Sequence, residues 1–176
     1  MIKKLFFLFG ICFSLVSFSI PEKIEKKADK VISKFLDTEN FQKKTITISE
    51  ALDKKTASEF TNGNLFSISS KGSIVGYGYI GNAPSKTATF DYLVLFDPNF
   101  IITKSKVLIY REEYGGEIGS KRWLQQFDGE SSKSSELKYN QDIIPISGAT
   151  ISVRSMTKAM NNLLQSIAVL QKEKAL

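Results

Sequence analysis

The residues of this chain with the clearest potential for chemistry are Ser147-Gly148-Ala149-Thr150-Ile151-Ser152, where three hydroxyls stand beside a glycine and an alanine. They lie just ahead of a segment with the apolar spacing of a long helix. Free amide N–H groups and the positive end of a helix dipole favour an anion, so a phosphate or phosphoester oxygen would be stabilised there. The alternative is a plain cap, in which Ser147, Thr150 or Ser152 begins the helix and Gly148 permits the turn.

The composition excludes several other kinds of site. The 176-residue chain has no histidine, and its single cysteine, Cys12, lies in an apolar N-terminal run. Loss of that run would leave no Ser-His-Asp or Cys-His site, no His/Cys zinc site, no thiolate-held iron–sulfur cluster and no Cys-x-x-Cys-His haem attachment. We therefore expect no metal site, no catalytic residue of these classes, and any redox chemistry to come from an organic cofactor.

The first nineteen residues have the pattern of a secretory signal peptide. Lys3 and Lys4 precede the apolar run Leu5–Val16, and Ser17-Phe18-Ser19 places small residues before a cleavage point after Ser19. We expect an exported protein of the periplasm or cell envelope, and an uncut signal would attach it to the membrane through its N-terminus. Without residues 1–19 the chain keeps 22 basic and 18 acidic residues, because only Lys3 and Lys4 leave. These charges are interspersed, which argues against a nucleic-acid partner.

The remaining sequence predicts an α+β fold, in which an antiparallel sheet of four or more strands is packed by an N-terminal and a C-terminal helix. Apolar residues at helical spacing predict helices over 22–37, 120–127 and about five turns after Ile151. Less regular signals predict a short strand over 45–48 and a helix over 51–60. Two-residue alternation with turn-rich links predicts antiparallel strands over 65–69, 73–80, 89–96 and 101–110.

Two local patterns refine that expectation. Phe90, Tyr92, Val94 and Phe96 alternate with Leu93 and Leu95, as in a central strand that is covered on both faces. Gly76 and Gly78 in the preceding strand indicate a bulge or the close approach of another group.

The motif and its surroundings resemble a known family. Ser147-Gly148-Ala149-Thr150-Ile151-Ser152, with the apolar helix behind it, resembles the flavinylation motif of the FMN-binding domain in the periplasmic flavin subunits of the sodium-translocating NADH:quinone oxidoreductase and of Rnf complexes. Upstream, Val75–Tyr79, Phe90–Asp97, Ile101–Tyr110, a glycine-rich loop and Gln126–Gly129 are similar to the family's segments in order. The resemblance covers roughly residues 65–170.

This resemblance implies FMN as cofactor, joined through its phosphate to Thr150 by a magnesium-dependent flavin transferase. It implies a role in electron transport between redox partners in the envelope, as a carrier or flavin subunit rather than a stand-alone enzyme. The implied organisation is a signal at 1–19, an N-terminal helical segment at 20–64 and an FMN-binding domain at 65–176. The implied cofactor-binding residues are Ser147, Gly148, Ala149, Thr150 and Ser152 of the motif, and Tyr114, Gly115, Gly116 and Gly119 of the loop.

The sequence departs from the family pattern at two places. Ile144 stands where the family usually has an aspartate three residues before the motif, and Asp142 is the nearest acid. The loop reads Glu113-Tyr114-Gly115-Gly116-Glu117-Ile118-Gly119 in place of the family's Thr-Pro-Gly-x-Gly. Two alternatives therefore stay open, a module that binds FMN noncovalently and a flavin-free structural or assembly protein of an envelope complex.

Other aromatic and acidic residues have two interpretations each. Trp123 and Phe127 share one helix face and are expected in the core. Tyr77, Tyr79, Tyr110 and Tyr114 either contact an isoalloxazine ring or are ordinary strand and loop aromatics. Glu112 and Glu113 have no evident substrate pocket for acid/base work.

Overall fold

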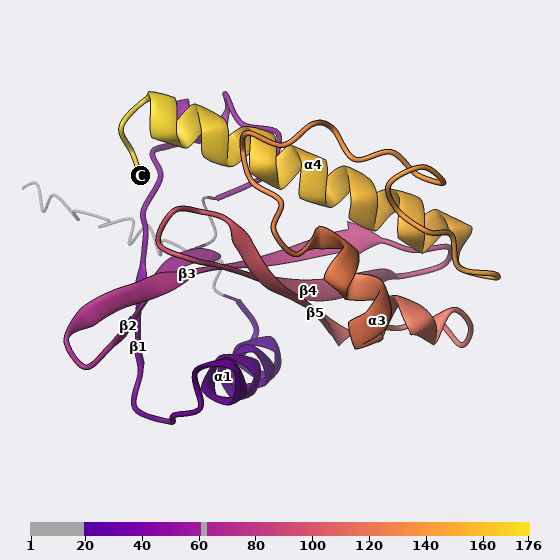
Figure 1. The fold of residues 1–176 in the computed structure, drawn as a ribbon, viewed down its shortest axis with the longest axis horizontal. Helices are drawn as coiled ribbons and strands as arrows, with labels where there is room; N and C mark the ends of the chain where they lie inside the picture. The colour runs from indigo at the N-terminus through magenta and orange to yellow at the C-terminus, as the bar shows by residue number, and fades with distance from the viewer. Residues whose placement is uncertain (1–19, 61–62) are drawn as a thin grey trace, which may run out of the picture.

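A computed structural model describes residues 20–60 and 63–176, and these form three layers (Figure 1). The middle layer is an antiparallel sheet in the order β1-β2-β3-β4-β5, so each described strand pairs with its neighbours in the sequence. The strands are β1 (Gln42–Thr45), β2 (Leu65–Ser70), β3 (Ser73–Pro84), β4 (Thr89–Phe96) and β5 (Ile102–Ile109). Helix α1 (Glu22–Leu36) covers one face and α4 (Thr150–Lys172) the other. The predicted α+β class is confirmed.

Strand β4 has both faces buried, as its alternation predicts. Phe90, Tyr92, Val94 and Phe96 belong to the core under α4, whereas Leu93 and Leu95 belong to the core under α1. The α1 side is closed by residues four apart in the helix, Ile24, Ala28 and Ile32, all of which are buried. Such spacing puts them on one helix face.

The two expected glycine contacts are present in β3. A Cβ at Gly76 would collide with the main-chain oxygen of Phe96, and one at Gly78 would collide with the ring of Phe66. The pairing of β2 with β3 also shifts register between Ile68 and Ser69, opposite this segment. Close approach and an irregular ladder therefore occur together.

The N-terminal part differs from the sequence prediction in detail. The first strand lies at Gln42–Thr45 rather than 45–48, and the second helix, α2, is only Glu50–Asp53 rather than 51–60. The carboxylate of Asp53, the last residue of α2, accepts a hydrogen bond from the Phe60 amide and so holds the following residues in a non-helical loop. Since β1 pairs with β2 in the register Gln42↔Ser69, residues 20–64 contribute a strand to the sheet as well as helices.

The segment between β5 and α4 supplies short elements on the α4 side. These are η1 (Gly116–Gly119), α3 (Lys121–Leu124) and η2 (Gln125–Phe127). Trp123 and Phe127 are buried and meet edge to face at 5.4 Å, which confirms that they are core residues. No helix among the described residues is long and apolar enough to cross a membrane, and the expected signal at 1–19 lies outside them.

Candidate functional site

The predicted motif begins α4 at the rim of a recess. Thr150 is the first helical residue and Ala149 is the N-cap, and among the residues that the structure describes no side chain caps the helix. The plain capping interpretation is therefore wrong for this helix. Gly148 precedes it with φ of 75°, the left-handed conformation that glycine adopts readily. The Thr150 hydroxyl is exposed at the uncapped helix start, and the first turn carries no acidic residue.

The recess has a volume of about 420 Å³, within the ~300–1,000 Å³ range of small-molecule sites. Three elements line it: the tip between β3 and β4, the loop after β5, and the start of α4. The lining residues are Lys86, Tyr110, Glu112, Tyr114, Gly148, Ala149, Thr150, Ile151 and Ser152. Among these described residues Lys86 is the cation.

Only some of the residues expected at the site line the recess. Gly148, Ala149, Thr150, Ser152 and Tyr114 do so, and Ser152 is buried with its hydroxyl 3.1 Å from that of Tyr110. Gly115 lies behind them, because a Cβ there would collide with the Cβ of Ala149. The remaining three predicted residues, Ser147, Gly116 and Gly119, do not line it.

The aromatic candidates separate into two groups. Tyr110 and Tyr114 lie in the recess wall, and Tyr114 is 76% exposed. Tyr77 instead stacks on Phe100 with ring centroids 4.1 Å apart. Tyr79 is buried and donates to the main-chain oxygen of Glu59, and burial raises its pKa to about 12. Tyr77 and Tyr79 are therefore structural aromatics.

Glu112 fixes one wall of the recess. Its carboxylate accepts from the Thr87 amide at 2.7 Å, the Thr87 hydroxyl at 2.8 Å and the Ala88 amide at 3.1 Å. The nearby Ser85 hydroxyl, together with hydrogen bonds from the Thr87 amide and hydroxyl, lowers the pKa of Glu112 to about 2. The carboxylate thus serves the turn that carries Lys86 rather than acid/base chemistry.

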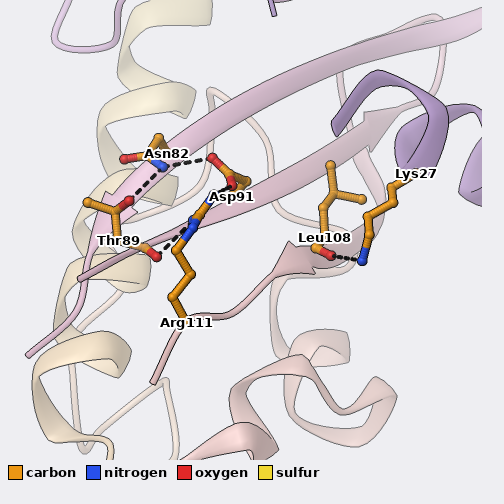
Figure 2. Close-up of polar contacts among 6 residues, drawn as sticks. All are labelled: Lys27, Asn82, Thr89, Asp91, Leu108 and Arg111. Carbon is orange, nitrogen blue, oxygen red and sulfur yellow. Dashed lines mark hydrogen bonds and ion pairs between the residues drawn. The ribbon is translucent and has the colours of Figure 1, made fainter. Parts of the chain in front are cut away.

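Arg111 holds the same hairpin from the adjacent position. Its guanidinium donates to the Thr89 main-chain oxygen at 2.9 Å and pairs with the Asp91 carboxylate at 2.5 Å (Figure 2). Asp91 is buried and also accepts from the Asn82 amide at 2.7 Å. On the opposite side, the Ser155 hydroxyl of α4 donates to the main-chain oxygen of Pro84. The tip bearing Lys86 is therefore attached both to the loop after β5 and to α4.

The approach to the motif is held by side chains of the preceding segment. The Trp123 indole donates to the Ile144 main-chain oxygen at 2.8 Å, and the Gln126 side chain accepts from the Ile144 amide at 2.7 Å. The Ile144 side chain is 65% exposed at this departure from the family pattern. Asp142 accepts from the Lys138 amide in a local turn.

Comparison with known families supports the resemblance in the sequence. Residues 86–165 match the family model described as the FMN-binding domain. By this match, residues 86–165 are those of an FMN-binding domain. A comparison with curated proteins gave no match. The matched stretch runs from Lys86 to Gln165 and so includes all three elements of the recess, and the family indicates FMN as the cofactor.

The recess fits FMN on grounds independent of the family. A phosphate needs N–H donors and positive charge, and the uncapped start of α4 and Lys86 offer both. A flavin ring needs flat apolar contact, which Tyr110, Tyr114 and the half-exposed Ile151 provide. The sequence analysis missed Lys86 and Ile151 as site residues, since nothing in the order of residues shows that the β3–β4 tip folds back over the motif.

Proposed function

We propose that this FMN-binding domain is an exported electron carrier whose FMN is joined through its phosphate to Thr150. The observation that carries the proposal is the position of Thr150, an exposed hydroxyl at an uncapped helix start on the rim of the recess. Ser147 does not line the recess, and the buried Ser152 hydroxyl contacts that of Tyr110. Thr150 is therefore the hydroxyl best placed for modification.

Each part of the recess has a task in holding the cofactor. The first-turn amides of α4 and the Lys86 ammonium would hold the phosphate charge, while Tyr110 and Tyr114 would flank the ring. When bound, FMN supplies one- or two-electron transfer. The hairpin contacts of Arg111 and Glu112 keep Lys86 in place, so the site is organised before the cofactor arrives.

A covalent tether suits an exported carrier because a loosely bound cofactor would be lost to the surroundings by dilution. Attachment requires a donor with an activated phosphate, such as flavin adenine dinucleotide. The Thr150 oxygen loses its proton and bonds to the flavin-side phosphorus, while the bond from that phosphorus to the bridging oxygen breaks and AMP leaves with the proton. A magnesium-dependent flavin transferase in the envelope is the partner that this step requires. Redox proteins of the envelope would supply and accept the electrons.

The tether is tested by producing the chain in the periplasm together with a flavin transferase and weighing it by mass spectrometry. The wild-type chain should gain the mass of one FMN phosphoester, and Thr150→Val should gain none. Ser147→Ala is the matched control, because it removes a neighbouring hydroxyl outside the recess and should leave the mass gain intact. FMN mass retained in Thr150→Val would place the modification elsewhere.

Noncovalent FMN binding is the second candidate, and Ile144 is the observation that favours it. The nearest acid, Asp142, does not replace the family's aspartate at that position, since its carboxylate accepts a hydrogen bond from the Lys138 amide. Denaturing the purified protein separates the candidates: covalent FMN stays with the polypeptide, whereas noncovalent FMN passes through a membrane filter. A colourless protein that takes up no FMN would instead favour the structural or assembly role.

A further inference from the structure

A second concave site lies on the other side of the sheet's outer strand, away from Thr150. This groove has a volume of about 600 Å³ and lies between α1, β5 and the α3–η2 segment. Its described lining is Lys30, Val31, Lys34, Phe35, Thr103, Lys104, Ser105, Lys106, Lys121, Leu124, Gln125 and Asp128. Five of these residues are lysines and one is acidic, so the groove is strongly positive. It shares no lining residue with the recess at Thr150.

The lysines of this groove form no ion pair among the described residues, although Asp128 interacts electrostatically with Lys104 and Lys121. On the flank of α1 that faces β1, Lys43 pairs with Glu25 at 3.2 Å and with Asp29 at 2.5 Å. On the other flank, Lys27 donates to the main-chain oxygen of Leu108 at 3.1 Å (Figure 2). Within residues 20–60 and 63–176, no carboxylate oxygen lies within ion-pair distance of the five groove lysines.

The lysines that β5 contributes lie on the α1 face of the sheet. Lys104 and Lys106 stand opposite Leu95 and Leu93 of the α1-side core, whereas Ser105 stands opposite Val94 of the α4-side core. Lys104 and Lys106 therefore share one face with Lys30 and Lys34 of α1, and Lys121 of α3 lies on the other side of the groove. Carboxylate oxygens are the acceptors that such a set of ammonium groups binds best.

Strand β5 has its edge covered at both ends, and the groove lies against the open stretch between them. At the start of the strand, the Ile102 amide donates to Glu130 and the Gly129 amide donates to Ile102. At the end of the strand, the Lys27 ammonium donates a hydrogen bond to the Leu108 main-chain oxygen. Thr103–Lys106 lies between these two closures and forms the wall of the groove. The half-exposed Phe35, with Lys104 5.8 Å above its ring, adds an apolar contact at the rim.

We propose that this groove is a docking site for an acidic segment of a partner protein. Charge complementarity selects a segment with several Asp or Glu residues, and the partly exposed Val31 and Phe35 select an apolar side chain between them. A flat bilayer surface does not fill a concave site of about 600 Å³, and a second copy of this chain would bring its own positive groove. Docking here leaves the recess at Thr150 uncovered, so it would hold a partner without blocking the cofactor.

The test measures binding of the purified chain to a fluorescein-labelled peptide built of Asp, Glu and Leu, by fluorescence anisotropy at low and at physiological salt. Wild-type protein should bind, and affinity should fall with salt because exposed charges are screened. Lys30→Glu/Lys34→Glu should weaken binding about tenfold or more, since two attractive charges become repulsive. The readout does not involve flavin, so it stands apart from the proposed function.

The matched control is Lys158→Glu/Lys172→Glu, which makes the same charge change on exposed lysines of α4. Lys172 lies in the last turn of α4 as Lys34 lies in the last turn of α1, so the two variants cost similar helix-dipole energy. Affinity within about twofold of wild type is expected for this control. Lys30→Gln/Lys34→Gln, which adds no acid, replaces the reversal variant if thermal melts show that variant to be unfolded.

Amide NMR spectra recorded with the same peptide locate the contact. Shifts should concentrate on Thr103–Lys106 and on the second half of α1. Equal loss of affinity in the groove and control variants, or shifts confined to the recess at Thr150, would overturn the proposal. The proposal would also be overturned if the chain did not bind the peptide but sedimented with phosphatidylglycerol vesicles and not with phosphatidylcholine vesicles. Loss of peptide binding in millimolar inorganic phosphate would overturn it as well.

Discussion

At the scale of single residues, the recess combines groups that the sequence presents separately. Lys86 and Thr150 are 64 positions apart, yet both line one recess because the β3–β4 tip folds over the start of α4. Gly115 lets the loop after β5 approach Ala149 more closely than any side chain would permit. Loss of the Lys86 charge should be measurable in FMN binding, and loss of the close approach at Gly115 should be measurable in stability.

Replacing Lys86 with Met should weaken FMN binding. The substitution keeps an unbranched side chain and removes the cation of the recess, and a charge-assisted hydrogen bond is worth about 1.5–3 kcal/mol, or roughly tenfold or more in affinity. Quenching of flavin fluorescence on titration of the unmodified chain measures the dissociation constant. Lys158→Met on the exposed face of α4 is the control, and equal affinity of the two variants would mean that Lys86 does not touch the phosphate.

Gly115→Ala should lower both stability and FMN binding, because Gly115 has φ of 77° and an added Cβ would overlap that of Ala149. We expect a loss of about 1–3 kcal/mol in the free energy of unfolding. Urea denaturation measures it. Gly116→Ala next door is the control, since nothing lies within 4 Å of a Cβ there and it should change stability by less than about 0.5–1 kcal/mol. Equal effects at both positions would contradict this account.

At the scale of elements, the β3–β4 hairpin is the part that depends most on ionised side chains. Arg111 and Glu112 are consecutive residues after β5, and each holds a different part of the hairpin. Arg111 contacts Thr89 and Asp91. Glu112 contacts Thr87 and Ala88. The Glu112 bonds are stronger when the carboxylate is ionised, since charge-assisted hydrogen bonds exceed neutral ones. Hairpin position is therefore linked to pH through this residue.

Stability contributed by Glu112 should be lost in acid. Its pKa is lowered from 4.5 to about 2 in the folded chain, so ionisation favours folding. The contribution is fully present above the unfolded value of about 4.5 and declines as pH falls toward 2. Thermal melts of wild type and Glu112→Gln between pH 2 and 7 should differ most at neutral pH and converge near pH 2. A constant difference across this range would contradict the assignment.

The elements also show what sequence reasoning can reach. Helix α1, the four strands from β2 to β5 and helix α4 follow from apolar spacing, because each buries a repeating face. Strand β1 was placed three residues late and α2 was too long, since Gln42–Thr45 is a polar edge strand whose pairing with β2 no local pattern reveals. The motif at Thr150 was recognisable in the sequence, whereas the walls at Lys86 and Tyr110 depend on long-range folding.

At the scale of the whole molecule, the question is where the independently stable FMN-binding domain begins. The family match begins at Lys86, inside the β3–β4 tip, and the sequence analysis placed the domain at 65–176. The sheet is nevertheless buried on two faces, and the second face is covered by α1 from outside both ranges. Ile24, Ala28 and Ile32 pack there against Phe66, Ile68, Ile80, Leu93, Leu95 and Leu108.

A fragment of residues 65–176 should therefore be less stable than 20–176. It loses the edge strand β1, and the loss of α1 returns an apolar sheet face to water at roughly 25 cal/mol per Å². We expect it to bind the dye ANS and to melt at a lower temperature by calorimetry. Ala28→Asp in residues 20–176 puts a charge into the same interface and should act in the same direction, whereas the exposed Lys23→Asp should not. If the fragment melts like the longer chain without binding ANS, α1 is an appendage rather than a layer of the fold. If the fragment is destabilised as expected, residues 86–165 depend for their stability on α1, a helix that lies outside the family match.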